Sequence, residues 1–412
     1  MKLLFSISLC LLVCSVTFGQ TQTLDHFLET AKNNSPLLKD LQNQVASNQI
    51  DSLRLRAGLR PQVNLTSAGL YAPVAGGYGY ASAITNEHTL NALMGVNQAI
   101  VGKKNIDAQL QAITLQSQSV KNTTKISEQD LKKAITTQYI TAYGSLQQFK
   151  FNQELINLLS KEEALLKQLT RNNVYRQSDY LTFLVTLKQQ ELTVAQSRLQ
   201  YKTDYTTLNY LAGVTDTAMV ELTEPDIHQN ILPDAANSIF FAQYRIDSLK
   251  LINSRQLVDF SYKPKASILA DGGYNSDFSS SQAYKNFGIS AGFTFTMPIY
   301  DGGQRKMQYR KISLEEQTRQ GYKAFFDSQY KQLIAQLKLQ INETENLLKK
   351  VDEQLKYSES LIKVDNQLLQ TGDLRIADLI LAVSNYFTIR NLRTTTNINK
   401  LQLINQLNYW NK

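Results

Sequence analysis

The chain carries the same sequence pattern twice, about 200 residues apart, and this duplication limits its possible folds more than any other feature. Leu-Asn-Tyr-Leu at 208–211 recurs as Leu-Asn-Tyr-Trp at 407–410, and Asp-Tyr-Leu at 179–181 recurs as Asp-Leu-Ile at 378–380, both at an offset of 199. Each copy predicts a helix, two strands with a long loop, a very long helix, a break and another long helix. Neither copy can bury its apolar faces alone, so we expect stacking of the copies or oligomerisation.

The repeats set the expected domain boundaries. The first repeat is predicted at residues 20–213 and the second at 237–412, with a linker at 214–236 that contains Pro225 and Pro233. Residues 1–19 begin with Lys2, followed by an apolar run at 3–16 and small residues, which is typical of a cleaved secretory signal. A retained anchor is the alternative, although the run is shorter than the ~20 residues of a membrane helix. No later apolar run reaches 18 residues, so no membrane-spanning helix is expected.

Composition argues against an enzyme. Both cysteines, Cys10 and Cys14, lie in the predicted signal, so the mature chain has no disulfide, thiolate chemistry or cysteine metal site. The net charge of +8 is spread along the chain, which is typical of solvated faces and argues against nucleic acid as a partner. His26, His88 and His228 lack metal-ligand spacing. Since no phosphate loop, nucleophile elbow or paired-acid motif is present either, no cofactor is predicted.

One segment near the middle of the second copy has an unbroken two-residue period. Over residues 287–299 every second position is apolar, and the positions between are small or polar apart from Pro298. Thirteen residues exceed the ~9–11 of a tilted membrane strand. Shorter or less regular matches occur at 62–71, 90–100 and 266–271. The side chains predicted to face lipid are Phe287, Ile289, Phe293, Phe295 and Met297.

A soluble antiparallel sheet with one wet face would show the same alternation. However, four strands in two separated pairs make a poor soluble core, and the smallest common membrane barrels need about eight strands. Several chains must therefore contribute strands to one barrel, and we favour a membrane barrel over a soluble sheet.

The long helices show heptad spacing. One is predicted from about residue 306 to 370, without proline, and the other from about 104 to 169. At 1.5 Å per residue each reaches roughly 100 Å. A soluble filament or tether would explain such helices too, but not the signal segment and the strands. The heptad positions of the second copy are Ile334, Ile341, Leu348, Leu355, Ile362 and Leu369.

Taken together, these features resemble the TolC family of outer-membrane efflux proteins over essentially the whole mature chain. Pro-Ile-Tyr-Asp-Gly-Gly at 298–303 is similar to the family's turn between strand and helix. The segment 371–378, from Thr-Gly-Asp to Asp378, is similar to its motif at the helix break, and 208–213 to its Leu-Asn-x-Leu-x-Gly ending. The first copy departs from the pattern, with Val-Gly-Lys-Lys at 101–104 and Asn173 in place of the glycine at the helix break.

The resemblance implies a mostly α-helical fold with membrane β-strands. In a homotrimer, four strands per chain would form a twelve-strand outer-membrane β-barrel, and the duplicated helix hairpins would form a periplasmic α-barrel. It implies a passive exit duct in a Gram-negative outer membrane, exporting small molecules or polypeptides with a periplasmic adaptor and an inner-membrane transporter, and contacting outer-membrane lipid. A periplasmic coiled-coil adaptor or structural tether is the alternative.

The helix breaks are the predicted functional ends of the duct. The resemblance places the adaptor-docking tip at Asn173, Gln177, Asp179, Gly372, Leu374 and Asp378. Arg176 and Arg375 align at the offset of 199, with Asp373 nearby, and rings of charge can close a constriction. We therefore predict Arg176, Asp373 and Arg375 as periplasmic gate residues. For the aspartates, stabilisation of a helix N-terminus is the alternative role.

Overall fold

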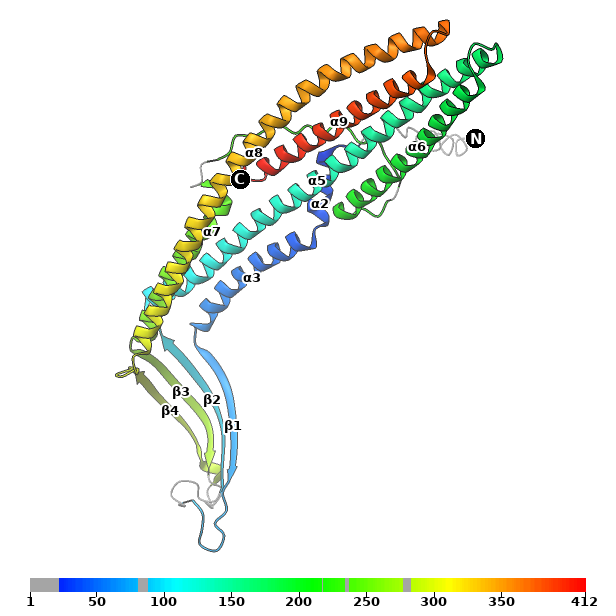
Figure 1. The fold of residues 1–412 in the computed structure, drawn as a ribbon. Coiled ribbons are helices and arrows are strands. Elements are labelled where there is room, and N and C mark those ends of the chain that lie inside the picture. The colour runs from blue at the N-terminus through cyan, green and yellow to red at the C-terminus, as the bar shows by residue number, and fades with distance from the viewer. Residues whose placement is uncertain (1–21, 81–87, 217, 234–236, 277–282) are drawn as a thin grey trace, which may run out of the picture. The chain divides into compact units, whose positions relative to one another are not determined.

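Figure 1 shows the fold in the computed structural model, which describes residues 22–80, 88–216, 218–233, 237–276 and 283–412. The predicted signal at 1–19 lies outside the described residues. The described chain is mostly helical with one four-stranded antiparallel sheet, which confirms the predicted secondary-structure class. The repeat and linker boundaries remain predictions.

The long helices follow the sequence closely. Helices α5 (Lys103–Arg171) and α8 (Gln304–Thr371) begin and end within two residues of the predicted bounds. Each is followed by a shorter helix, α6 (Gln177–Ala212) and α9 (Ile376–Asn408) respectively. No helix among the described residues combines the length and apolar character needed to span a membrane.

The start of the first copy differs from the prediction, because two helices replace the single one expected. These are α2 (Leu24–Asn34) and α3 (Pro36–Gly58), whereas the second copy begins with one helix, α7 (Ile239–Ser261). Pro36 lacks the N–H that a continuous helix would need, but suits the first position of a new one. The Ser35 hydroxyl accepts a bond from the Leu38 amide at 3.4 Å, which helps to cap α3.

The chain forms two compact units, and the long helices contribute to both. Of the described residues, those within 22–39, 125–239 and 326–412 form unit 1, and those within 40–124 and 240–325 form unit 2. Unit 2 therefore holds most of α3 and α7, the whole sheet and the first parts of α5 and α8. Unit 1 holds α2, α6, α9 and the remaining parts of the long helices.

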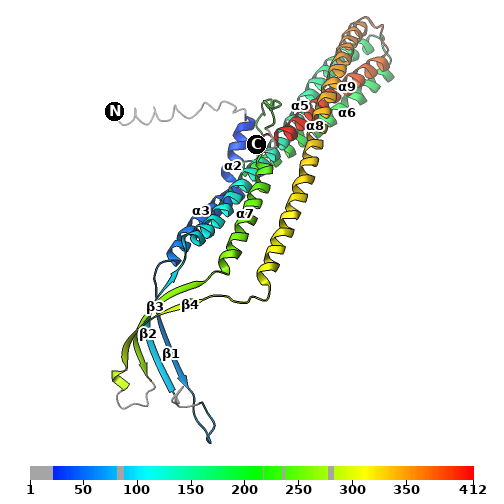
Figure 2. The same cartoon turned by 90° about the vertical axis from the view of Figure 1, so that its left-hand side faces the viewer.

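The sheet of unit 2 joins the two sequence copies. Its strands are β1 (Gln62–Tyr71), β2 (His88–Ile100), β3 (Lys265–Ser276) and β4 (Phe287–Thr296). They lie in sequence order with every neighbouring pair antiparallel, as Figure 2 also shows. A short 3₁₀ helix, η2 (Ala283–Lys285), precedes β4. The β2–β3 pairing thus connects the strand pair of one copy to that of the other.

The register gives the sheet one apolar face. Met94 lies opposite Leu65 and Gly272, and Gly272 lies opposite Ile289, so one row of small or apolar residues crosses all four strands. Since side chains alternate along each strand, the rows two residues away share this side. We call this side the apolar face. Its other Phe, Tyr and larger aliphatic members are Val63, Tyr71, Leu90, Val96, Ile100, Ile268, Tyr274, Phe287, Phe293 and Phe295.

The opposite side, the polar face, carries the sheet's charges. Within the four strands the only Lys, Arg, Asp or Glu residues are Lys265 and Asp271, and the register places both on this face. Asp271 accepts a bond from the Ser290 hydroxyl at 2.8 Å. Thr294, one of the small or polar positions of the alternating segment, is on this side as well.

The last strand ends earlier than predicted. β4 stops at Thr296, although the sequence alternation runs to Ile299. Pro298 has no N–H for a ladder bond, so the pairing cannot continue through it. Met297 therefore follows the strand, and Phe295 is its second-last residue. Of the residues predicted to face lipid, Ile289 and Phe293 occupy the interior of β4.

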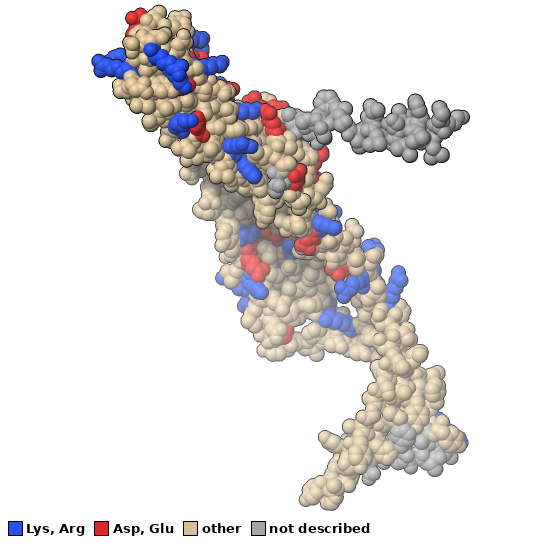
Figure 3. Space-filling model, turned by 90° about the vertical axis from the view of Figure 1, so that its right-hand side faces the viewer, with Lys and Arg blue, Asp and Glu red and all other residues tan. Residues whose placement is uncertain are grey.

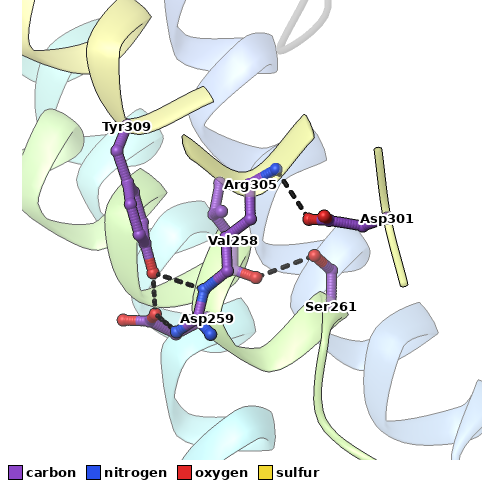
Figure 4. Close-up of polar contacts among 6 residues, drawn as sticks. All are labelled: Val258, Asp259, Ser261, Asp301, Arg305 and Tyr309. Atoms are coloured by element: carbon purple, nitrogen blue, oxygen red, sulfur yellow. Dashed lines mark hydrogen bonds and ion pairs between the residues drawn. The ribbon is translucent and has the colours of Figure 1, made fainter. Parts of the chain in front are cut away.

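Polar contacts fasten the helices of unit 2 to one another. On α8, Arg319 bonds Glu316 through two contacts of 2.6 Å and donates to the Tyr244 carbonyl of α7 at 3.1 Å. Hydrogen bonds from Arg319 lower the pKa of the Glu316 carboxyl to about 2. Figure 4 shows a second cluster, where Arg305 contacts Asp259 at 2.6 Å and Tyr309 bonds the same carboxylate.

In unit 1, the predicted linker packs on the helices rather than extending away from them. The Tyr139 hydroxyl of α5 lies 2.8 Å from the Thr223 carbonyl oxygen, and Tyr201 of α6 donates to Val220 at 2.6 Å. Burial raises the pKa of both tyrosines. Leu222 and Phe27 of α2 complete this aromatic core.

Gly273 offers a test of the β2–β3 pairing. An added Cβ there would overlap the Ala92 carbonyl oxygen and lie 2.9 Å from Leu93 Cα, so the β2 backbone would have to move. We expect Gly273→Ala to weaken this pairing by about 1–3 kcal/mol, the usual cost of overpacking. Hydrogen exchange of β2 and β3 amides should become faster.

The matched control is Gly288→Ala on β4, where the new Cβ meets no heavy atom within 4 Å and exchange should not change. Equal hydrogen-exchange rates of the β2 and β3 amides in the two variants would contradict the close approach at Gly273.

Candidate functional site

The two helix breaks have the same backbone structure. At the end of α5 the Val174 amide donates to the Leu169 carbonyl at 3.0 Å, and at the end of α8 the Asp373 amide donates to Leu368 at 3.1 Å. Bonds from the Asn173 and Gly372 amides, to Thr170 and Leu369, complete a Schellman motif in each copy.

Both motifs need one residue with positive φ. Asn173 has φ 56° and Gly372 has φ 83°. Asparagine is the commonest substitute for glycine in this conformation, so the first copy keeps the turn despite its different residue.

Aspartates lie in the first turns of α6 and α9, the helices that follow the two breaks, and make different contacts there. The Asp179 carboxylate accepts a bond from the Arg176 amide at 3.3 Å, as in a capping box. Asp378 instead accepts two bonds from the Arg375 guanidinium, at 2.8 and 2.9 Å. This hydrogen-bonded carboxylate raises the pKa of Arg375. The Asp179 contact is of the kind expected for the alternative, helix-terminus role, whereas Asp378 lies in the first turn of α9 and pairs with an arginine side chain.

The three gate candidates are exposed at these turns and do not contact one another through ion pairs. Arg375 is bonded to Asp378, while Arg176 and Asp373 have no ion pair within 4.0 Å in the described part of the chain.

The two turns touch each other above a shared core. A Cβ on Gly372 would lie 2.6 Å from Cγ1 of Val174, so the second turn packs closely on the first. Leu374, a predicted docking residue, is only 7% exposed and belongs to this core, whereas Gln177 is exposed. Helices α5, α6, α8 and α9 all contribute, with Leu159, Leu166, Phe183, Leu369, Ile376 and Leu379 among the buried members.

Two titratable groups at this end were not identified from the sequence. Asp365 of α8 is buried, and burial together with the nearby Asp378 carboxylate raises its pKa. Burial also raises the pKa of Tyr175, and the Asp373 and Asp179 carboxylates add to this effect. Asp365 occupies a position between the apolar heptad residues Ile362 and Leu369, so its burial could have been suspected from that spacing.

The apolar face of the sheet is the second candidate site. Its side chains are exposed in the single chain: Ile289 is 90% and Phe293 81% accessible. The sheet region at the bottom of Figure 3 shows almost no charged side chains on the visible face. An exposed apolar surface of this extent marks an interaction with lipid or protein.

Among the described residues no group of three or more His, Cys, Asp or Glu side chains is placed to hold a metal ion.

Comparison with known proteins identifies the fold. No protein-family model matches the chain, and a search of curated proteins gave no match. Among solved structures, the outer membrane protein VceC of Vibrio cholerae aligns with a TM-score of 0.75 at 14% identity, over 94% of this chain and 95% of VceC. This chain has the fold of a TolC-type outer-membrane channel. The resemblance predicted from the sequence is confirmed at the level of fold.

Two further structures agree. The CmeC outer membrane channel of Campylobacter jejuni gives a TM-score of 0.74 at 10% identity, covering 94% of this chain and 85% of CmeC. The open state of the MtrE outer membrane channel of Neisseria gonorrhoeae gives a TM-score of 0.74 at 11% identity, covering 94% of this chain and 88% of MtrE. The TolC-type fold thus accommodates a sequence that shares few residues with these channels.

Gly372→Ala tests the contact between the turns. A side chain at φ 83° is strained and would also collide with Val174. We therefore expect the substitution to destabilise the folded turn by about 1–3 kcal/mol. Limited proteolysis within residues 368–378 should become faster. Val174→Ala in the same chain should restore part of the protection.

The matched variant is Asn173→Gly in the other copy, which should be cleaved at the original rate because glycine adopts positive φ readily. Cleavage of Gly372→Ala at that same rate would show that the turn does not require glycine.

Proposed function

We propose that this chain is a passive exit duct in the outer membrane of a Gram-negative cell, exporting small molecules or polypeptides. The observation that carries this proposal is the register of the sheet, which places most of the larger apolar residues of the four strands on one face and both charges on the other, with Leu70, Leu93 and Leu269 as the larger apolar residues of the polar face. Membrane strands need this arrangement, with lipid on one side and water on the other.

The proposed duct is a homotrimer. Four strands cannot close, and β1 and β4 leave unpaired edges at the two sides of the sheet. Pairing β1 of one chain with β4 of the next in a threefold ring would form a twelve-strand barrel and remove every edge. The apolar face would then contact outer-membrane lipid.

The helix turns of unit 1 are the proposed periplasmic end. Here we place docking of a periplasmic adaptor, which links the duct to an inner-membrane transporter. Leu374 is buried, so Asn173 and Gln177 are the most exposed of the predicted docking positions, with the 48% exposed Val174 beside them. Asp179, Gly372 and Asp378 are half-buried. The source of energy would lie in the transporter, so the duct itself needs no catalytic group.

Arginine substitutions on the sheet test the membrane assignment. Ile289 lies mid-strand on the apolar face. Ile289→Arg should therefore destabilise the membrane-inserted barrel by about 2–4 kcal/mol and prevent its assembly. Phe295→Arg, near the strand end, should cost only about 0–1 kcal/mol. Heat-modifiable trimer in the outer-membrane fraction measures assembly.

The polar-face controls are Ser290→Arg and Thr294→Arg, each next to one of these positions. Both should assemble and alter conductance instead. Normal assembly of Ile289→Arg together with failure of Ser290→Arg would reverse the assignment of the faces, and soluble periplasmic protein would favour a tether.

We further propose that Arg176, Asp373 and Arg375 hold the periplasmic end closed through ion pairs between neighbouring chains of the trimer. Their exposure supports this proposal. Neutralising Asp373 and Arg375 together should raise single-channel conductance in planar bilayers and sensitise cells to large antibiotics, because rings of charge at a constriction would be lost.

The control neutralises Lys188 and Glu191, an exposed ion pair of 2.8 Å on α6 away from the turns. It should leave conductance unchanged. If both double variants conduct like the original chain with the same ion selectivity, the gate is not charged.

A further inference from the structure

A basic hollow lies in unit 2 where β2 leads into α5 and α7 leads into β3. Its volume is about 760 Å³, and its lining includes Lys103, Lys104, Lys263 and Lys265 but no aspartate or glutamate. The ion-paired lysines of the described residues all lie elsewhere in the chain. Four cations without a carboxylate partner create a positive potential that favours an anionic ligand.

The corresponding junction of the second copy carries an aspartate where the first copy has none. There Asp301 accepts bonds from the amides of Gly303 and Arg305, both at 2.9 Å, at the start of α8. These backbone bonds lower the pKa of the Asp301 carboxyl. In the first copy Gly102, Lys103 and Lys104 align with Asp301, Gly302 and Gly303, and the first turn of α5 has no acidic residue. The fold can therefore form this junction without lysines at the two positions of Lys103 and Lys104, and the positive start of α5 is not neutralised by a neighbouring aspartate.

The rest of the hollow is apolar and continuous with the apolar face. Phe260 and Leu257 line it, together with Ile100 and Ala266. Ile100 lies opposite Ala266, and Ala266 lies opposite Phe295, so this row is the edge of the apolar face nearest the hollow. A ligand with an anionic head and a long apolar tail would match both parts.

A neighbouring copy of the chain is a poor occupant. The hollow lies beside β2 and β3, the inner strands, whereas a copy extending the sheet would pair with the outer edges at β1 and β4. Free phosphate would satisfy the lysines but would leave the apolar lining uncovered.

We propose that this hollow binds the phosphate headgroup of an anionic phospholipid whose acyl chains lie along the apolar face of the sheet. The proposal rests on the proposed function in one respect, namely that the apolar face contacts lipid. Lys103, Lys104 and Lys263 would bind the phosphate, since clusters of basic residues near a membrane select anionic lipids. The Lys263 ammonium also lies 4.5 Å from the centre of the Phe260 ring, which joins the charged and apolar parts.

The test uses full-length protein purified in a neutral detergent, with bound lipid counted by native mass spectrometry. The probes are phosphatidylglycerol, phosphatidylcholine with the same acyl chains, and inorganic phosphate. The site variant changes Lys103, Lys104 and Lys263 to Gln. The matched control changes three exposed lysines of α8, Lys349, Lys350 and Lys356, to Gln.

The original chain and the control variant should retain phosphatidylglycerol in preference to phosphatidylcholine. The site variant should bind it at least about tenfold more weakly, because each lysine near an anionic lipid adds to the attraction. A variant with Arg at the same three positions should keep the lipid, which separates loss of charge from loss of fold.

Three results would overturn the proposal. Equal retention by the site and control variants would show that these lysines do not bind lipid, and loss from the Arg variant would show that positive charge is not what binds it. Retention of phosphatidylcholine at the same level would remove the anionic selectivity. Displacement by inorganic phosphate would make the hollow a site for a free anion. Because the assay is independent of fractionation, protein found outside the outer membrane would reject the proposed function separately.

Discussion

The antiparallel pairing of β2 with β3 is the interaction on which the four-stranded sheet of this chain depends. It joins the strand pairs of two sequence copies, and its register decides which side chains share a face. With Met94 opposite Gly272 the apolar sides of both pairs coincide, but a slip of one residue would turn one pair over. The slip would expose apolar residues on both faces, and no single face would suit lipid. The close approach at Gly273 helps to explain why this register needs a glycine.

Divergence between the copies has altered charge more than backbone. Asn173 and Gly372 occupy the same position of the same helix-ending motif, although only one of them is glycine. Asp179 and Asp378 stabilise aligned helix starts, one through a backbone amide and the other through an arginine side chain. At the junctions between strand and helix, by contrast, Asp301 in one copy aligns with Gly102 in the other, beside two lysines. The duplicated backbone therefore leaves each copy free to present different chemistry at equivalent places.

The same separation explains the low identity to channels with this fold. Identities of 10–14% accompany alignment over 94% of the chain. Apolar periodicity, turn geometry and strand alternation can be met by many residue combinations, since cores tolerate substitution when volume and patterning are kept.

Sequence alone predicts the elements that depend on neighbouring residues. Heptad spacing and the lack of proline predict α5 and α8 to within two residues, and strict alternation predicts β4 up to the residues before Pro298. The helix breaks follow from Gly372 and the aligned Asn173 in the same way. These features are local, because φ, ψ and side-chain direction within one helix or strand are determined by residues a few positions apart.

Contacts between distant segments were decided only in the tertiary structure. Sequence pattern did not reveal that Leu374 is buried beneath the turns, that Val174 packs on Gly372, or that Asp365 lies beside Asp378. Nor did it bring Lys103 and Lys263 to one hollow from positions 160 residues apart. Such meetings depend on which rows of two elements face each other, and rotating a helix or shifting a strand by one residue changes them without altering either element's own pattern.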